Sequence, residues 1–511
     1  MIVARSVSSI EITFLHTNDF HAHFEQFNIE GDTCTREEAE NRECYGGVAR
    51  MVTKVKEMRK ENPSTILVDA GDQLQGSNWF YQYEGSATAY FLNKIGFDAM
   101  AISNHEFDGG LGILASYLNK ITFPVVSCNI VTTQEPILQG LFTKSTTLRV
   151  GGERFGIVGY TTSRANLLST TGNLVFEDEI DAIRREVNKL LASGLNKIIV
   201  IGTADYTINL RIANEVHGVD IVAGADPFTL RTRGKPNPTD EQLHGHNYPT
   251  VIRPEGSSET VLVVQVQIYF MYIGYLKVTF DEEGRITHYS GKPIPLDWRI
   301  QQDPETLKEI EEWAKPVRKL EEIYIGETYS RLEGESAVCR VRECNLGNLI
   351  ADSMVSAHAT GQGEQGWSDV SIALMVSGGI RDSIEQEGLI TKSNILRVLP
   401  YANTVDMVEL KGRHILEAME RSVEKFDTLL LPGFFLQHSG LIVTYDLRSP
   451  PRSRVQSVQV LCTECTIPKY EPLDLSKSYK VVLPSYLANG GDGYAMISDN
   501  KENHIIGKFL L

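Results

Sequence analysis

Basic residues are scarce in this chain of 511 residues. Its 49 lysines and arginines are outnumbered by 66 aspartates and glutamates, which gives a formal net charge of -17 at pH 7. A surplus of negative charge this large disfavours non-specific binding to nucleic acids and to anionic membranes. We therefore expect no nucleic-acid partner, while a local basic pocket for a small anion stays compatible with the total.

A long apolar run is also missing. A membrane-spanning helix needs roughly 18 or more apolar residues in succession. The most apolar stretch, 261–276, is interrupted by Gln265, Gln267 and Gly274. We expect no membrane span and interpret this stretch as buried strands. The length suggests two domains or three.

Cysteine is sparse, but its spacing is informative. The seven cysteines form three close pairs and a singleton, Cys128, which follows an apolar stretch. Close pairs are typical of local disulfides in an oxidising compartment. A zinc site would need two pairs to converge, and no histidine stands at finger spacing. We favour disulfides, an extracellular location and a buried free thiol at Cys128.

The order of patterns along the first 300 residues predicts an α/β fold. Short apolar runs indicate buried strands, and apolar residues at every third or fourth position indicate helices. The expected strands are 10–15, 65–68, 99–102, 198–201 and 219–223, and the expected helices are 48–60, 86–95 and 180–191. This alternation predicts a layered, largely parallel sheet.

A charged helix is predicted at the junction of two domains. Asp303 is suited to cap a helix and Pro304 to its first position. Residues 305–320 then indicate a solvated helix with a kink at Pro316. We expect a first domain at 1–303, a linker helix at 304–322 and a separate α+β domain at 323–511.

Three polar clusters follow three of the predicted strands. They are Asp19-Phe20-His21, Gly71-Asp72-Gln73 and Asn104-His105-Glu106-Phe107-Asp108. Ligands in open α/β sheets bind just beyond the carboxyl ends of strands. Each cluster by itself could be a turn, a helix cap or an exposed polar segment. Three of them at three strand ends favour a two-metal phosphoesterase centre, in which paired cations activate water and neutralise phosphoryl oxygens.

The same motifs resemble the 5'-nucleotidase family, which includes ecto-5'-nucleotidases and the salivary apyrases of blood-feeding arthropods. In the first domain the resemblance rests on residues 16–21, 69–73 and 103–108, with Ser103 in place of the family's usual glycine. In the second domain it rests on 339–345, 377–381 and 487–494, so that it covers nearly the whole chain. It implies a metallophosphatase domain joined by a helix to a nucleotide-binding domain, with the active site between them.

The resemblance implies roles for individual residues in both domains. The residues that match metal ligands are Asp19, His21, Asp72 and Asn104, and those that match the catalytic pair are His105 and Asp108. In the second domain, the matching residues are Arg340 and Arg381 for the phosphates, Tyr401 and Tyr486 for the two faces of the adenine, and Asp492 for the ribose. These types suit the task, because aromatic rings stack on bases and guanidinium groups pair with phosphate oxygens. Together with the short spacings, the resemblance predicts disulfides Cys34–Cys44, Cys339–Cys344 and Cys462–Cys465.

Two departures from the family affect the metal site. The family has a histidine after each of the strands 198–201 and 219–223, where this chain has Thr203 and Asp226. Phe228 and Val376 each stand where the family has a polar side chain, near the metal and near the base. Loss of an indirect partner of a metal typically costs 10–100-fold in affinity or activity. Loss of two direct imidazoles should cost more.

A divalent metal (Zn, Mg, Ca or Mn) is still expected, with at most one site tightly occupied. Asp226 is suited to a hard cation such as Mg or Ca. His244 and His246 lie in a nearby stretch and are an alternative source of ligands, but a solvated loop is the better interpretation.

Two functions stay open on the sequence alone. The first is a secreted protein with impaired catalysis that binds adenine nucleotides or nucleosides, or a host platelet or coagulation protein, and so opposes platelet aggregation, as the resemblance to salivary proteins implies. The chain has no Arg-Gly-Asp tripeptide, so integrin mimicry through that motif is not supported. The second is an active metal-dependent nucleotidase or apyrase that hydrolyses AMP, ADP or ATP.

Overall fold

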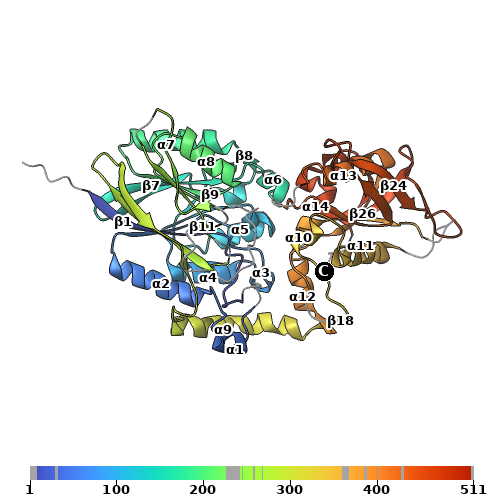
Figure 1. The fold of residues 1–511 in the computed structure, drawn as a ribbon, viewed down its shortest axis with the longest axis horizontal. Coiled ribbons are helices and arrows are strands. Elements are labelled where there is room, and N and C mark those ends of the chain that lie inside the picture. Colours follow the sequence, from blue (N-terminus) through green and yellow to red (C-terminus); the bar gives the residue numbers. More distant parts are fainter. Residues whose placement is uncertain are drawn as a thin grey trace, which may run out of the picture. The chain divides into compact units, whose positions relative to one another are not determined.

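In a computed structural model of the chain, two compact units are formed by Met1–Val317 and Arg318–Leu511 (Figure 1). The described residues are 9–28, 33–225, 242–243, 246–256, 259–266, 269–359, 368–384, 388–401, 403–426 and 431–507. The domain limits expected from the sequence, with a separate linker at 304–322, stay a prediction.

Two mixed sheets form the centre of the first unit. One has the strand order β16-β15-β1-β2-β3-β4, with β17 (Ile294–Pro295) paired to β15, and the other has the order β13-β14-β10-β9-β7-β6. In the first sheet β1, β2, β3 and β4 pair in parallel, and β15 and β16 are antiparallel to their neighbours. In the second sheet β7, β9, β10 and β14 pair in parallel, and β6 and β13 are antiparallel to their neighbours.

The strands of these sheets are short, and most are buried. In the first sheet they are β1 (Ile10–Thr17), β2 (Thr65–Asp69), β3 (Ala99–Ala101), β4 (Val125–Val126), β15 (Tyr272–Phe280) and β16 (Ile286–Gly291). In the second they are β6 (Ser145–Val150), β7 (Glu153–Thr161), β9 (Ile198–Thr203), β10 (Ile221–Ala225), β13 (Thr250–Ile252) and β14 (Val261–Val264). The predicted strands in 261–276 correspond to β14 and the start of β15.

Helices cover the outer face of each sheet. Because side chains alternate along a strand, Ile12 and Phe14 of β1 pack against the second sheet, whereas Leu15 faces the helices. The first sheet is covered by α2 (Val48–Glu61), α4 (Ser86–Ile95) and α5 (Gly110–Leu118), and the second by α7 (Glu179–Ala192) and α8 (Tyr206–Glu215). This layered α/β architecture confirms the predicted fold class of the first unit.

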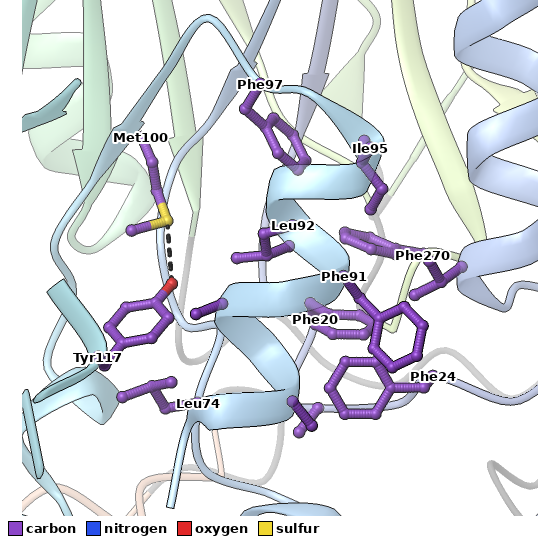
Figure 2. Close-up of a cluster of buried hydrophobic side chains, with 14 of the residues drawn as sticks. Phe20, Phe24, Leu74, Phe91, Leu92, Ile95, Phe97, Met100, Tyr117 and Phe270 are labelled. Carbon is purple, nitrogen blue, oxygen red and sulfur yellow. Dashed lines mark hydrogen bonds between the residues drawn. The ribbon is translucent and has the colours of Figure 1, made fainter. Parts of the chain in front are cut away.

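Aromatic side chains anchor α4 beneath the polar strand ends of the first sheet (Figure 2). Phe91 of this helix packs on Phe24, and Phe20 stacks on Phe270 with ring centroids 4.2 Å apart. Phe20 stands between the two polar residues of its cluster, Asp19 and His21. Its burial therefore holds the loop that carries them.

The helix α9 (Pro304–Arg318) packs on the first unit. The sequence predicts a solvated helix, but Ile310, Ala314 and Val317 are buried in the same core as α2 and α4. The reason is their spacing, which places them on one face of the helix. Asp303 Oδ1 accepts a hydrogen bond from the Thr306 backbone N–H at 3.0 Å, as expected for a capping residue.

The second unit has its own five-stranded sheet and two buried clusters. The strand order is β22 (Leu436–Ser439), β19 (Ile372–Val376), β26 (Ser478–Pro484), β21 (Val405–Lys411) and β27 (Glu502–Ile505). One face packs against α13 (Gly412–Ser422), α14 (Ser485–Ala488), α15 (Ala495–Ser498) and the small sheet of β23 (Leu441–Tyr445), β24 (Val455–Leu461) and β25 (Tyr470–Pro472). The other packs against α11 (Asn345–His358) and α12 (Lys392–Val398). The predicted second unit of mixed strands and helices is confirmed.

The cysteines follow the predicted pairing. Disulfides join Cys34 to Cys44, Cys339 to Cys344 and Cys462 to Cys465, and Cys128 is free and buried. Burial raises the pKa of the Cys128 thiol to about 12, so it stays protonated and inert. In the described part of the chain, no helix combines the length and the apolar character that crossing a membrane requires.

His16 is a buried polar side chain near the carboxyl end of β1. It pairs across the strands with Gly274 of β15, where a Cβ would lie 2.0 Å from the imidazole. Its Nε2 is 2.8 Å from the hydroxyl of Tyr248. Burial lowers the pKa of His16 from 6.5 to about 3, because the charged imidazolium is poorly solvated there.

We predict that His16 makes the fold sensitive to acid. A lowered folded-state pKa contributes stability that is present above pH 6.5 and is lost as the pH falls toward 3. Relative to His16→Gln, the wild-type free energy of unfolding should decline by up to ~1.4 kcal/mol per pH unit in that window. Urea unfolding at several pH values measures this difference. His288→Gln, at an exposed position on β16, is the control, and an equal pH dependence in both variants would contradict the assignment.

Candidate functional site

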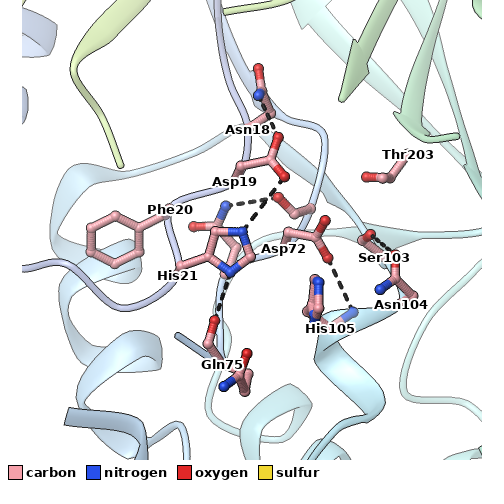
Figure 3. Close-up of polar contacts among 12 residues, drawn as sticks. Asn18, Asp19, Phe20, His21, Asp72, Gln75, Ser103, Asn104, His105 and Thr203 are labelled. Atoms are coloured by element: carbon pink, nitrogen blue, oxygen red, sulfur yellow. Dashed lines mark hydrogen bonds and ion pairs between the residues drawn. The ribbon is translucent and has the colours of Figure 1, made fainter. Parts of the chain in front are cut away.

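The polar clusters lie where three neighbouring parallel strands end (Figure 3). β1, β2 and β3 are adjacent and parallel, so the loops after Thr17, Asp69 and Ala101 emerge at one edge of the sheet. The predicted metal ligands in these loops are buried: Asp19, His21, Asp72 and Asn104. The sheet therefore brings together residues as far apart in the sequence as Asp19 and Asn104.

Three of these residues form a compact cluster. One ligand atom each of Asp19, His21 and Asp72 lies within 4.8 Å of the others. All three have left-handed backbones, with φ of 52°, 53° and 63° respectively. Such strain is uncommon for residues other than glycine and concentrates at functional sites.

The imidazole of His21 is oriented by the backbone. Its Nδ1 is 2.6 Å from the Gln75 carbonyl oxygen, which selects the tautomer with a proton on Nδ1. The other nitrogen, Nε2, then faces Asp19 Oδ1 at 3.7 Å. Imidazoles that bind metals commonly donate their second N–H to a carbonyl in this way.

The predicted catalytic pair stands beside the cluster. Asp108 Oδ2 lies 2.6 Å from His105 Nδ1, and the His105 ring is 5.2 Å from that of His21. The His105 backbone N–H also donates to Asp72 Oδ1 at 3.1 Å. Asp108 therefore fixes the orientation of an imidazole that borders the candidate metal centre.

Glu106 is the residue of this site that sequence reasoning missed. Its buried carboxylate accepts hydrogen bonds from the backbone N–H groups of Asp72, Gln73 and Ser103 at 3.1, 2.5 and 2.7 Å. Burial, followed by the charge of Asp72, raises the pKa of Glu106 to about 7. The sequence does hold one signal for this role. Glu106 lies between His105 and the apolar Phe107 in the motif, and this position indicates that its carboxylate is buried.

Asp72 supplies the observation that tests whether these residues fit a cation. Its Oδ2 is buried and has no hydrogen-bond donor among the described residues. Burial raises the pKa of Asp72, while the charge of His105 acts against it. A buried carboxylate oxygen without a donor is costly unless a cation pairs with it. Two carboxylates and an imidazole thus fit a divalent metal.

The two departures from the family have different outcomes. Thr203 ends β9 next to this site (Figure 3). Its Oγ1 donates to the Ala70 carbonyl oxygen at 2.8 Å. Its hydroxyl is therefore committed to the loop that precedes Asp72. Asp226 lies outside the described residues, as do Phe228 and His244.

Asn104 is buried in the loop after β3, and its Oδ1 is 3.3 Å from Ser103 Oγ.

The predicted adenine and ribose residues converge in the second unit. The Tyr486 hydroxyl accepts a hydrogen bond from the Asp492 backbone N–H at 3.1 Å, and its ring covers Gly491, where a Cβ would lie 2.4 Å away. Burial raises the pKa of Tyr486 well above its ordinary value, and the nearby Asp492 and Tyr401 add to the shift. The three side chains expected around the nucleoside are thus neighbours.

The two predicted phosphate arginines converge on a contact between two glycines. The backbone N–H of Gly378 donates to the Gly433 carbonyl oxygen at 2.9 Å. Arg340 Nη1 donates to the Leu431 carbonyl oxygen at 2.9 Å, and its Cζ is 3.9 Å from where a Cβ on Gly433 would stand. Arg381 Nη1 is 3.5 Å from the Gly378 carbonyl oxygen. A Cβ on Gly433 would lie 2.9 Å from Gly378 Cα, so the close approach of these two segments requires glycine at position 433.

Family models of known proteins match each of the two units separately. The Calcineurin-like phosphoesterase model matches residues 12–247, and the model of the 5'-nucleotidase C-terminal domain matches residues 324–499. The first unit is therefore a metallophosphatase unit, and this class implies dependence on a divalent metal.

Relatives of known identity match both units. The chain is 42% identical to the 5'-nucleotidase of Mus musculus, over 98% of this chain and 87% of the mouse protein. It is 41% identical to the Snake venom 5'-nucleotidase of Naja atra, over 98% of this chain and 94% of the venom protein. The crystal structure of a 5'-nucleotidase precursor from Thermus thermophilus superposes with a TM-score of 0.84 at 36% identity, covering 98% and 94% of the two chains. The chain belongs to the 5'-nucleotidase family.

We predict that purified protein retains at most one equivalent of a transition metal after dialysis. The reason is that the described cluster offers one set of ligands, Asp19, His21 and Asp72. Metal analysis by mass spectrometry measures the stoichiometry. Asp72→Asn should lower retention at least about tenfold, whereas Asp181→Asn, an exposed substitution on α7, should not. Two equivalents of zinc in the wild type would refute the prediction.

Proposed function

We propose that this member of the 5'-nucleotidase family has impaired phosphoester hydrolysis and retains binding of adenine nucleotides. The observation that carries the proposal is the Thr203 hydroxyl, which is used in a hydrogen bond to the Ala70 carbonyl oxygen at the edge of the cluster. Position 203 therefore carries a hydroxyl that is already hydrogen-bonded, where the family has a histidine imidazole. Asp226, at the second such position, adds a carboxylate instead of an imidazole.

The remaining residues of the first unit support one metal rather than two. Asp19, His21 and Asp72 would hold a divalent cation, with Asn104 nearby. When bound, the cation would activate water and neutralise charge on phosphoryl oxygens. Asp108 holds the His105 imidazole in one orientation, which suits it to hold or deliver a proton beside the phosphate. One cation in place of a pair removes part of the charge stabilisation that phosphate ester hydrolysis needs.

Nucleotide binding depends on a different unit and so persists. Tyr401 and Tyr486 offer aromatic faces for adenine, Asp492 a carboxylate for the ribose, and Arg340 and Arg381 guanidinium groups for phosphates. Val376 in place of an amide removes one polar contact, at a cost of about 1 kcal/mol. That cost is small beside the stacking of a base, which contributes about 1–3 kcal/mol.

The three disulfides support a place outside the cell. There, capture of adenine nucleotides by a protein similar to salivary apyrases would oppose platelet aggregation. Contact with a host platelet or coagulation protein would have the same effect and is the outcome to pursue if no nucleotide binds.

A second function is an active nucleotidase that works with one metal or an altered pair. Two observations favour it: the pairing of His105 with Asp108, and the Asp72 Oδ2 atom, for which the described residues offer no donor. Phosphate release from AMP and ADP, measured with added Mg, Ca, Mn or Zn, distinguishes the two functions. Rapid turnover by pure wild-type protein would overturn the proposal of impaired catalysis.

We predict that the double substitution Thr203→His and Asp226→His raises hydrolysis of AMP at least about tenfold, because it restores two imidazoles. Phosphate release in the presence of zinc measures the gain. Thr203→Val with Asp226→Asn is the control, since it changes both positions without adding an imidazole. An equal rise in both double variants would show that the hydroxyl bond of Thr203, and not ligand loss, limits the rate.

We also predict that Tyr486→Ala weakens adenosine and AMP binding by about 1–3 kcal/mol through loss of stacking. Titration calorimetry measures both affinities. Tyr470→Ala, at a 42% exposed tyrosine of β25, is the matched control and should change neither. Unchanged binding after Tyr486→Ala would remove the adenine site from this part of the unit.

A further inference from the structure

The amide of Gln437 is buried against the loop that carries Arg340. Gln437 lies on β22, the end strand of the second unit's sheet, and its side chain has no exposed surface. Its Oε1 accepts a hydrogen bond from the Cys344 backbone N–H at 3.0 Å. Its Nε2 donates to the carbonyl oxygens of Cys339 and Arg342 at 2.7 and 2.8 Å.

These three hydrogen bonds bracket Arg340 on both sides. The disulfide between Cys339 and Cys344 closes the same loop at its two ends. A disulfide restrains the ends of a loop but satisfies none of the backbone groups between them. One amide supplies the donors and the acceptor that this small ring needs, and so selects one conformation of it.

The side chain of Gln437 also fixes how the loop meets the following helix. A Cβ on Gly347, in the first turn of α11, would lie 2.4 Å from Gln437 Oε1. The loop, the start of α11 and β22 are therefore in direct contact around one amide. Arg340 leaves this loop to reach the Leu431 carbonyl oxygen and the Gly433 backbone.

We infer that Gln437 is a positioning residue that aims the Arg340 guanidinium at the phosphate end of a bound nucleotide. The inference rests on the proposed nucleotide binding by the second unit. Gln437 itself contacts the loop backbone and not the ligand. It acts on the phosphate alone, because Tyr486 and Asp492, beside the nucleoside, have other contacts. The Tyr486 backbone N–H donates to Asn403 Oδ1, and the Tyr486 hydroxyl accepts from the Asp492 backbone N–H.

Only a neutral amide suits this place. A glutamate would set a carboxylate against two carbonyl oxygens that now accept hydrogen bonds. A methionine of similar length would leave two carbonyls and one N–H without partners, and buried backbone groups without partners are costly. In both cases the loop can relax into other conformations while the disulfide stays closed.

The test compares AMP with adenosine, which lacks the phosphate. Titration calorimetry on the full chain should show that Gln437→Met and Gln437→Glu weaken AMP binding about tenfold or more. The affinity for adenosine should stay within about twofold of the wild-type value, because a change of that size is smaller than the free energy of one ordinary hydrogen bond. Gln459→Met, on the exposed face of β24, is the matched control and should change neither affinity.

A purely structural role would give a different result. In that case AMP and adenosine would weaken in parallel, which would overturn the inference, as would unchanged AMP binding. Arg340→Ala combined with Gln437→Met should weaken AMP binding no more than Arg340→Ala alone, because the two act through one contact. If Gln437→Met does not unfold cooperatively, Gln437→Asn, which keeps the amide and shortens its reach, enters the same comparison with the same criteria.

The wild type and Arg340→Ala separate this inference from the proposed function. Wild-type protein should bind AMP more tightly than adenosine, and Arg340→Ala should reduce that preference. If wild-type protein binds neither compound, the proposed function fails, and the role of Gln437 fails with it. If the preference exists and depends on Arg340 but not on Gln437, only the present inference is overturned.

Discussion

One buried carboxylate joins the loops on which the candidate metal centre depends. Glu106 accepts backbone hydrogen bonds from Asp72, Gln73 and Ser103, so it ties the loop after β2 to the loop after β3. Asp72 is held in a left-handed backbone conformation, with φ of 63°, that would relax without such support. His105 directly precedes Glu106 in the chain, so the same contacts fix its position. The positions of Asp72 and His105 thus depend on the Glu106 carboxylate.

The threonine at position 203 is accommodated without disturbing the fold. Its hydroxyl donates a hydrogen bond to the Ala70 carbonyl oxygen, so this buried donor has a partner. The two sheets pack through Ile12, Phe14 and their partners. The second unit has a separate sheet and core. Substitutions at the strand ends of the first unit therefore need not disturb the aromatic and arginine residues of the second.

The sequence was most informative where a local rule decides the structure. The apolar stripe of 48–60 matches α2 within one residue, because helical spacing needs no distant partner. The three disulfides also agree with the prediction, since short spacings leave few alternatives. The prediction that α9 is a solvated helix was wrong, because its burial depends on distant partners. Its charged residues dominate the sequence, but the apolar Ile310 and Ala314 find a core that only the fold supplies.

By itself, the sequence determined the α/β class and the place of the polar clusters, because strand ends and motif letters are properties of short segments. It also determined that Thr203 and Asp226 are not histidines. Only the tertiary structure decided that Thr203 donates a hydrogen bond to Ala70 and that Asp72 Oδ2 has no donor within the described part of the chain. The same holds for the supporting residues Glu106 and Gln437. Each acts through backbone groups of a distant loop, and backbone groups carry no side-chain identity that a sequence pattern could reveal.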